Sequence, residues 1–302
     1  YELEMSAVLV IFDYCQTITI TVCLVITTPL AFFVYLKLLV IRPFSENYTF
    51  KLIVINGIAE LLNCVIYLIN YQLTNYPFML NYYIYIQQIE MVTPLAVIHA
   101  FLDGLSLHTT LFIALNRLKT ILFIRRLSND SMFFLVSIIL SFSLALPSIF
   151  DYCFTTTVVY RRFRNSSIVF PSTTNTNDRI HSQILQTVST IIRIVVSLAS
   201  LLVNMFLAVL ITRERKYIDI ADRNKFNGEK GLVITSIVSY VFYMLYFANN
   251  IIAQYFDVRV SGYSQWLFLG LNSLTPFWCL VIFTPSVRRL LFQWRNNGRD
   301  AT

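Results

Sequence analysis

Charged residues are scarce in this chain of 302 residues: only 13% are Asp, Glu, Lys or Arg, whereas 57% are hydrophobic. Soluble domains carry about a quarter charged residues, and a globule of this length would still need a polar surface. A surface that faces lipid explains the deficit directly. Glycine and proline are few as well, at 7 and 8 residues, which argues against a fibrous or loop-rich protein. The composition predicts an integral membrane protein.

Metal-binding cysteine patterns and catalytic motifs are also lacking. The five cysteines have no metal-like spacing, and Cys23, Cys64 and Cys279 lie in apolar runs, where a thiol packs as a small hydrophobic group. Cys15 and Cys153 are the two that could face an oxidising exterior, which leaves one disulfide open. No His-Glu-x-x-His, Gly-x-Ser-x-Gly or paired-Asp motif is present, so the sequence predicts no enzyme and no cofactor.

Seven apolar stretches are each long enough to cross about 30 Å of hydrocarbon as a helix. They cover approximately residues 17–41, 50–71, 91–123, 132–154, 184–211, 232–255 and 266–283. No internal repeat is visible, which disfavours the inverted-repeat transporters. The sequence therefore predicts an all-α membrane protein, a seven-transmembrane helix bundle that forms one domain over residues 1–302.

Lysine and arginine near the ends of the spans set the orientation. With the N-terminus outside, 17 of the 23 Lys and Arg residues fall in cytosolic segments, 5 fall outside, and Arg193 lies within a span. The net charge of +7 therefore points to membrane orientation and not to a nucleic-acid partner. This topology places one sequon outside, at Asn165, which is the predicted glycosylation site; those at Asn47 and Asn129 fall on the cytosolic side.

Ionisable groups within spans are costly in lipid and usually face the interior of a bundle. The second span holds Glu60, the third holds His99, Asp103 and His108 and ends at Arg117, and the fifth holds Arg193. At 1.5 Å per residue, Asp103 lies roughly 21 Å from Arg117 toward the outside, with Arg193 higher still. Glu60 sits lower, so the sequence predicts an outer basic layer and an inner acidic layer.

Two interpretations of Arg193 stay open. Its guanidinium could anchor an anionic ligand, because a guanidinium forms bidentate hydrogen bonds with a carboxylate or a phosphate. It could instead pair with Asp103 inside the bundle or extend to the outer interface. His99, one helical turn above Asp103 on the same face, is either a second pocket residue or a packing residue. The predicted ligand-binding set is Arg193, His99 and Asp103.

Glu60 also has two interpretations. As a core switch it could bind Na⁺ or a proton, together with neighbouring polar side chains: Asn56, Asn63, Ser106 and Asn272. Equally, it could be a protonated, hydrogen-bonded core residue, because burial favours the uncharged carboxyl. Asp103 lies three residues from Ser106 and could join the same network. No other metal is predicted.

Two segments at the membrane surface complete the pattern. Residues 286–295, after Pro285, are amphipathic and basic, which predicts a short eighth helix on the inner membrane surface. The first outer loop is rich in aromatic residues, interpreted as an interfacial belt rather than pocket lining: Tyr76, Phe78, Tyr82, Tyr83 and Tyr85.

Seven spans, Arg117 at the end of span three, Pro276 in span seven and a short eighth helix together resemble the G-protein-coupled receptor plan. The resemblance implies that Arg117 and its neighbour Asn116 meet a heterotrimeric G protein. It also implies that Glu60 and Ser106 match sodium-site positions. The chain departs from the usual pattern, because Asn116 replaces an acidic residue, span four lacks tryptophan and span six lacks proline.

A narrower resemblance fits these departures. Segment 114–123, with Asn-Arg followed by Ile-Leu-Phe, is similar to the signature of nematode serpentine chemoreceptors, the class gamma family in particular. That family implies a receptor in the plasma membrane of a sensory cilium, which senses a small environmental or pheromone molecule such as an acidic ascaroside. The partners implied are a G protein of the Gi/o type and a second receptor, in a homodimer or heterodimer.

The alternative is a small ligand-gated channel subunit or a transporter that uses the same polar residues as a permeation path. Such a protein would need charges aligned along one pore and, often, helices broken at glycine. Glycines within the spans are few, at positions 57, 104 and 270. The receptor is therefore the preferred hypothesis.

Overall fold

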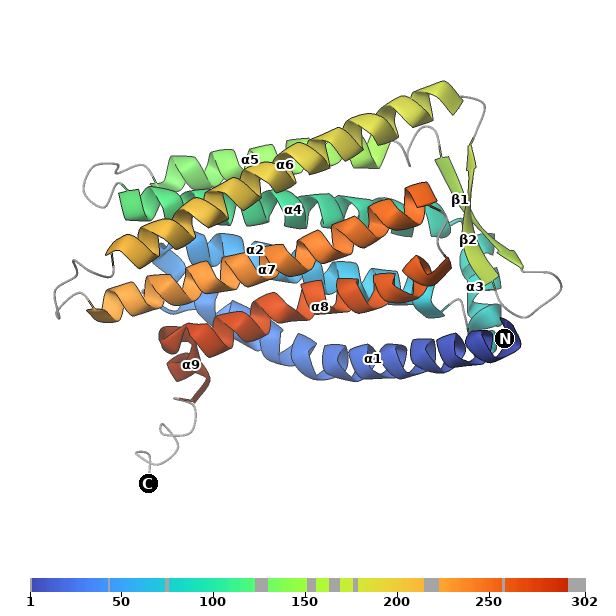
Figure 1. Cartoon of the computed structure of the whole chain (residues 1–302), viewed down its shortest axis with the longest axis horizontal. Helices are drawn as coiled ribbons and strands as arrows, with labels where there is room; N and C mark the ends of the chain where they lie inside the picture. Colours follow the sequence, from blue (N-terminus) through green and yellow to red (C-terminus); the bar gives the residue numbers. More distant parts are fainter. Residues whose placement is uncertain are drawn as a thin grey trace.

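The computed structural model describes residues 2–42, 44–73, 76–122, 130–150, 156–162, 169–175, 179–214, 223–256 and 259–292. Its long helices run side by side in one elongated bundle (Figure 1). Seven of them follow the bundle axis: α1 (Glu2–Val40), α2 (Tyr48–Tyr67), α4 (Val92–Leu122), α5 (Asp130–Phe150), α6 (Arg179–Glu214), α7 (Arg223–Phe256) and α8 (Arg259–Phe283). A short helix, α9 (Pro285–Phe292), follows α8 directly.

The two ends of the bundle differ. One, called the hairpin end, carries the start of α1, the short helix α3 (Leu80–Gln88) and the strands β1 (Thr156–Arg162) and β2 (Val169–Asn175) (Figure 1). The strands pair antiparallel, with Thr156 opposite Asn175 and Arg162 opposite Val169. The other, called the α9 end, carries α9. The sequence predicts neither α3 nor the two strands, which add a small hairpin to the otherwise helical fold.

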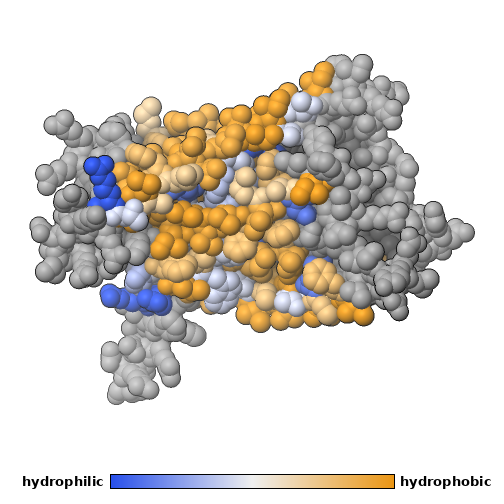
Figure 2. All heavy atoms as spheres, in the orientation of Figure 1, coloured by the Kyte–Doolittle hydropathy of each residue, from blue (hydrophilic) through white to orange (hydrophobic). Residues whose placement is uncertain are grey.

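The seven predicted spans coincide with the seven bundle helices. Six of these helices are long and apolar enough to cross a membrane, and α5 contributes a shorter apolar stretch, Ser131–Pro147. Hydrophobic side chains cover most of the visible face of the bundle (Figure 2). Val25, Ile139 and Leu202 are 66%, 54% and 67% exposed. Soluble monomers do not carry an apolar surface of this extent, so the chain is a multi-pass membrane protein.

Helix α4 is the centre of the bundle. It packs against α2, α5, α6 and α7. Of its most apolar stretch of 18 residues, 72% is buried, against 33% for the corresponding stretches of α1 and α6. The polar residues predicted in spans two and three therefore lie inside, and several are buried: Glu60, Asp103, Ser106, His108, Asn116 and Arg117.

The aromatic residues of the first connection at the hairpin end depart from the predicted interfacial belt. Phe78 and Tyr85 are 76% and 57% exposed, as a belt requires. Tyr83 and Tyr76 are buried instead, and the Tyr83 hydroxyl donates to the Ile69 carbonyl. Ile69 lies in a π-helical turn, η2 (Leu68–Gln72), that extends α2. Tyr83 thus fastens α3 to the end of α2.

Candidate functional site

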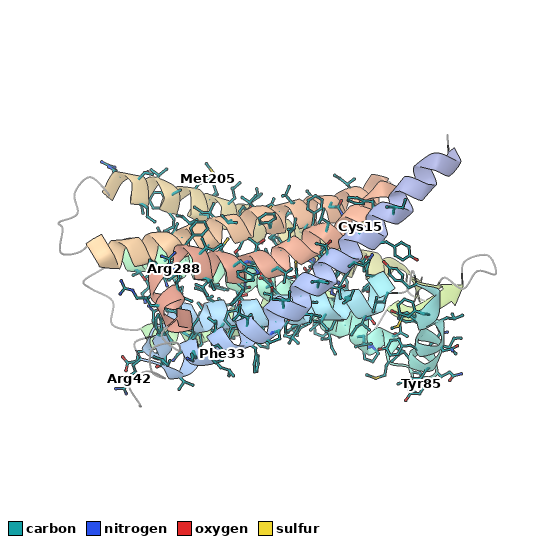
Figure 3. All side chains as sticks on the ribbon, turned by 90° about the horizontal axis from the view of Figure 1, so that it is seen from below. Cys15, Phe33, Arg42, Tyr85, Met205 and Arg288 are labelled. Atoms are coloured by element: carbon teal, nitrogen blue, oxygen red, sulfur yellow. The ribbon has the colours of Figure 1, made fainter. Side chains whose placement is uncertain are left out.

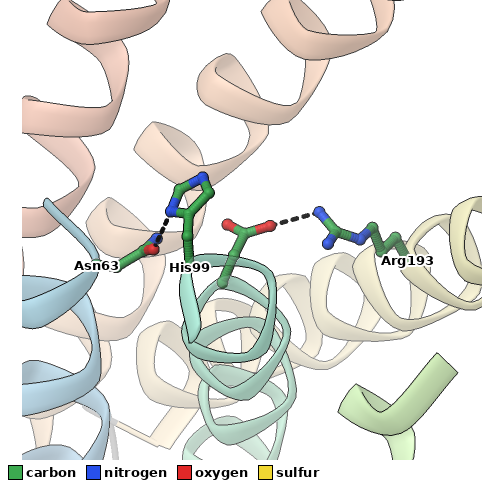
Figure 4. Close-up of polar contacts among 4 residues, drawn as sticks. Asn63, His99 and Arg193 are labelled. Carbon is green, nitrogen blue, oxygen red and sulfur yellow. Dashed lines mark hydrogen bonds and ion pairs between the residues drawn. The ribbon is translucent and has the colours of Figure 1, made fainter. Parts of the chain in front are cut away.

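A charge pair lies inside the bundle, toward the hairpin end. Arg193 of α6 donates through Nη1 to Oδ2 of Asp103 on α4, and the two side chains form an ion pair (Figure 4). The Asp103 side chain is 7% exposed and the Arg193 side chain 21%. The pairing that the sequence left open is therefore present, and the Arg193 side chain keeps part of its surface uncovered.

His99 lies beside this pair, between Asn63 of α2 and the carboxylate that Arg193 contacts (Figure 4). Its Nδ1 is 2.5 Å from Oδ1 of Asn63. Its ring is tilted against Tyr67 and Tyr71, with centroids 5.5 Å away in both cases. Tyr67 in turn stacks on Trp266 of α8, 5.7 Å between centroids and 7° between planes. Tyr67, Tyr71, His99 and Trp266 are called the aromatic cluster.

The aromatic cluster contains residues that the sequence does not single out. Asn63, predicted beside Glu60, faces His99 instead. A signal was available, because Asn63, Tyr67 and Tyr71 recur every four residues and so follow one face of a helix. Trp266 carries no comparable pattern, and only the packing of α8 on α2 brings it to Tyr67.

A second polar group surrounds Glu60, nearer the α9 end. Asn56 Nδ2 and Ser106 Oγ both donate to Glu60 Oε1 at 2.9 Å, and Thr109 Oγ1 donates to Asn56 Oδ1 at 2.6 Å. Glu60 Oε2 and Asn272 Oδ1 are buried, and neither has a hydrogen-bond partner among the described residues. Ser106 joins this group, whereas Asp103, one turn away, belongs to the charge pair.

A sodium site at Glu60 fits the oxygen atoms present. Within the described part of the chain, no three His, Cys, Asp or Glu side chains lie together as a metal site. Na⁺ needs no such cluster, because hard cations bind carboxylate, amide and hydroxyl oxygens together with water. Glu60 Oε2 is the oxygen that a cation would contact, since Oε1 already accepts two hydrogen bonds.

Arg117 and Asn116 lie near the α9 end of α4. Asn116 donates to Thr49 Oγ1 at the start of α2. Arg117 is 1% exposed, although the receptor resemblance implies that it meets a G protein. The hydrogen bond from the neighbouring Asn116 to Thr49 places the start of α2 beside this part of α4. In this conformation a second protein cannot reach the guanidinium.

Known proteins resemble this chain in fold and not in sequence. No protein-family model and no curated protein matches the sequence. In a comparison of folds, 51 chains of solved structures match, among them squid rhodopsin. The match to squid rhodopsin has a TM-score of 0.60 and 14% sequence identity, and it covers 93% of this chain and 85% of the rhodopsin chain. The chain has a rhodopsin-like fold.

Some of the remaining predicted positions lie at the ends of this rhodopsin-like fold, and others lie outside the described residues. In α9, Val287 is buried whereas Arg288 and Arg289 are exposed. Figure 3 places Arg288 at the same end as Arg42, with Tyr85 at the opposite end. Asn165 and Cys153 lie outside the described residues. Among the described cysteines, Cys15 is an exposed free thiol.

Proposed function

We propose that this chain is a G-protein-coupled receptor for a small acidic molecule, with its N-terminus outside the plasma membrane. One observation carries the proposal: a buried aspartate and a partly exposed arginine, Asp103 and Arg193, are paired inside a rhodopsin-like bundle. Charges within membrane spans are costly and mark functional sites. A guanidinium fork suits a carboxylate, so Arg193 is the residue at which an acid would bind.

A bound acid can act on the helices through this pair. Asp103 and Arg193 lie on different helices, α4 and α6, so the pair holds the two together. A ligand carboxylate at Arg193 competes with Asp103 and favours any conformation in which the two helices separate. That difference in affinity shifts a two-state equilibrium. The buried Arg117 at the opposite end then becomes accessible to the G protein.

The charge distribution supports the orientation of the receptor. Cytosolic segments would hold 17 of the 23 lysine and arginine residues, which follows the positive-inside rule. The exposed Arg42, Arg288 and Arg289 share the α9 end. With α9 along the inner surface, this basic end would face the G protein, for which we propose the Gi/o type.

The ligand class is proposed from the sequence resemblance. Segment 114–123 is similar to the nematode chemoreceptors of the class gamma family, which favours a receptor of a sensory cilium. An acidic ascaroside would supply the carboxylate that Arg193 requires.

The proposal is tested with the purified full-length chain and a purified G protein. Acidic small-molecule extracts are screened for nucleotide exchange, and the active acid is compared with its methyl ester. Arg193→Ala should weaken binding of the acid at least about thirtyfold, since truncating one side of a buried charge pair costs about 2–5 kcal/mol. Binding of the ester should weaken far less. Arg213→Ala, at the exposed end of the same helix, is the control.

Three results would contradict the proposal. Equal losses for acid and ester would make Arg193 a structural residue. A ligand-gated current without nucleotide exchange would favour the channel hypothesis. A full response from Arg193→Ala would place the acid elsewhere.

A further inference from the structure

We infer that His99, oriented by Asn63, accepts a hydrogen bond from the ligand beside the Arg193 anchor. The ligand is then an acid that also carries a donor group, such as a hydroxyl. This inference rests on the proposed function and narrows the class of ligand.

The hydrogen bond to Asn63 determines which nitrogen of His99 carries the proton. Asn63 Oδ1 is a carbonyl oxygen and can only accept, so His99 Nδ1 donates to it. A neutral imidazole has a single N–H, and its other nitrogen is an acceptor. Nε2 of His99 therefore presents a lone pair, and none of the hydrogen bonds among the described residues uses it.

The surroundings of His99 keep the ring neutral. On one side the ring contacts the aromatic faces of Tyr67 and Tyr71, which carry no charge. The nearby carboxylate, Asp103, is already paired with Arg193. His99 thus has no countercharge of its own, and it is half-buried rather than sealed in the core.

Trp266 supplies an independent observation in the same aromatic cluster. Its side chain is completely buried, and its Nε1 has no acceptor among the described residues. Buried polar groups are normally hydrogen-bonded, so an indole N–H without an acceptor is a candidate contact for a ligand oxygen. The aromatic cluster therefore contains both a donor, Trp266 Nε1, and an acceptor, His99 Nε2, and a hydroxyl group could bond to either one. Half-buried Tyr71 adds a flat apolar surface for the body of the ligand.

The proton position is measured first, without any ligand. The chain has three histidines, so ¹⁵N-histidine labelling of the full chain gives few signals, and His99→Phe identifies the one of interest. We expect the proton on Nδ1 of His99 and its partial transfer to Nε2 in Asn63→Leu. Asn70→Leu, in the π-helical turn that follows α2, should leave the signal unchanged. A proton on Nε2 in the wild-type protein would overturn the inference.

The ligand requirement is measured with matched pairs of medium-chain carboxylic acids that differ by one hydroxyl group. Affinities are taken from thermal shifts of the purified protein. The hydroxy acid of the best pair should bind about three- to tenfold tighter than its partner, as one hydrogen bond allows. His99→Phe should remove this difference, and His99→Gln should retain it, because its amide oxygen can accept near the Nε2 position.

The outcomes separate this inference from the proposed function. Hydroxy acids that keep their advantage in His99→Phe would overturn the role of His99. Acids that bind equally with and without the hydroxyl would also overturn the role of His99, but they would leave the Arg193 anchor intact. Failure of every acid to bind would contradict both the ligand class and the anchor.

Discussion

Asp103 and Arg193 illustrate at the residue scale how this bundle tolerates charge. Each would be costly alone in the interior, and their attraction offsets the cost only while both are present. The same holds around Glu60, where Asn56 and Ser106 satisfy one carboxylate oxygen. The sites are therefore stable as groups and sensitive to the loss of single members.

The first prediction concerns the charge pair. Arg193→Ala should lower the free energy of unfolding by about 3–5 kcal/mol, because Asp103 would stay buried without its partner. The double variant Asp103→Ala/Arg193→Ala should lose less than Arg193→Ala alone. Thermal unfolding of the wild type, both single variants and the double variant in one detergent forms the cycle that measures the coupling. Strictly additive losses would contradict an interaction between the two.

The second prediction concerns sodium at Glu60. Glu60→Gln keeps an acceptor for Asn56 and Ser106 but removes the charge, so the protein should fold and lose any response of agonist affinity to Na⁺. Glu60→Leu removes the acceptor as well, and should cost about 1–3 kcal/mol through the donors left unsatisfied. Agonist binding is compared in sodium and choline buffers. A sodium response that survives in Glu60→Gln would exclude this site.

The third prediction concerns Arg117. Arg117→Ala should abolish nucleotide exchange while ligand binding persists, because the guanidinium lies far from the charge pair and near the α9 end. Lys119→Ala, which loses a half-buried ammonium over the Phe133 ring, is the matched control and should still couple. Normal exchange by Arg117→Ala would remove this residue from the coupling surface.

At the scale of elements, the sequence predicts what depends on long apolar runs. All seven bundle helices are predicted by stretches of about 20 apolar residues, and α9 is predicted by the helical spacing of Val287 and the apolar residues that follow it. The sequence does not predict α3, β1, β2 or the π-helical turn of α2, because these are short and mix polar with aromatic residues. It also misses the Asn63–His99 contact, since partners between helices depend on how the helices rotate about their axes.

A fourth prediction follows from the contact between α7 and α8. A Cβ on Gly231 of α7 would lie 2.0 Å from the Phe283 carbonyl oxygen and 2.7 Å from its carbonyl carbon. Backbone atoms cannot rotate away, so Gly231→Ala should push α7 from the end of α8 at a cost of about 1–3 kcal/mol. We expect a lower thermal midpoint and nucleotide exchange raised several-fold without agonist.

Gly270 provides the control for this prediction. The three atoms nearest to a Cβ there belong to the side chain of Ile20, at 2.7 Å for the first of them, and a side chain can adjust more easily than a backbone carbonyl. Gly270→Ala should therefore leave basal exchange close to the wild-type value. Equal effects of the two variants would show that the close backbone contact at Gly231 has no special role.

At the scale of the whole molecule, the chain is an elongated helix bundle with an apolar outer surface and two unlike ends. The hairpin end carries the start of α1, α3 and the two strands, and the α9 end carries exposed arginines. Shape alone does not set which end faces the cytosol; the lysines and arginines do. The proposed orientation thus rests on composition at the span ends, and it is open to a direct chemical test.

Glycosylation provides that test. The sequon at Asn165 lies in sequence between β1 and β2, the two strands of the hairpin end. Those at Asn47 and Asn129 directly precede in sequence α2 and α5, which begin at the α9 end. If the hairpin end is outside, only Asn165 meets the glycosylation machinery. Asn165→Gln should then abolish the mobility shift produced by glycosidase treatment of the protein expressed in cells. Asn129→Gln should leave the shift unchanged.

The control at Asn47 needs a conservative change. Asn47 is the N-cap of α2, and its side-chain oxygen accepts from the Thr49 amide at 2.9 Å. Losing such a cap costs about 1 kcal/mol, which would confuse a folding defect with a topological one. Asn47→Asp keeps the capping oxygen and removes the glycan acceptor. We expect the mobility of this variant to change on glycosidase treatment as that of the wild type does. If the change is lost in Asn47→Asp but not in Asn165→Gln, the topology is inverted and Arg117 lies outside the cell.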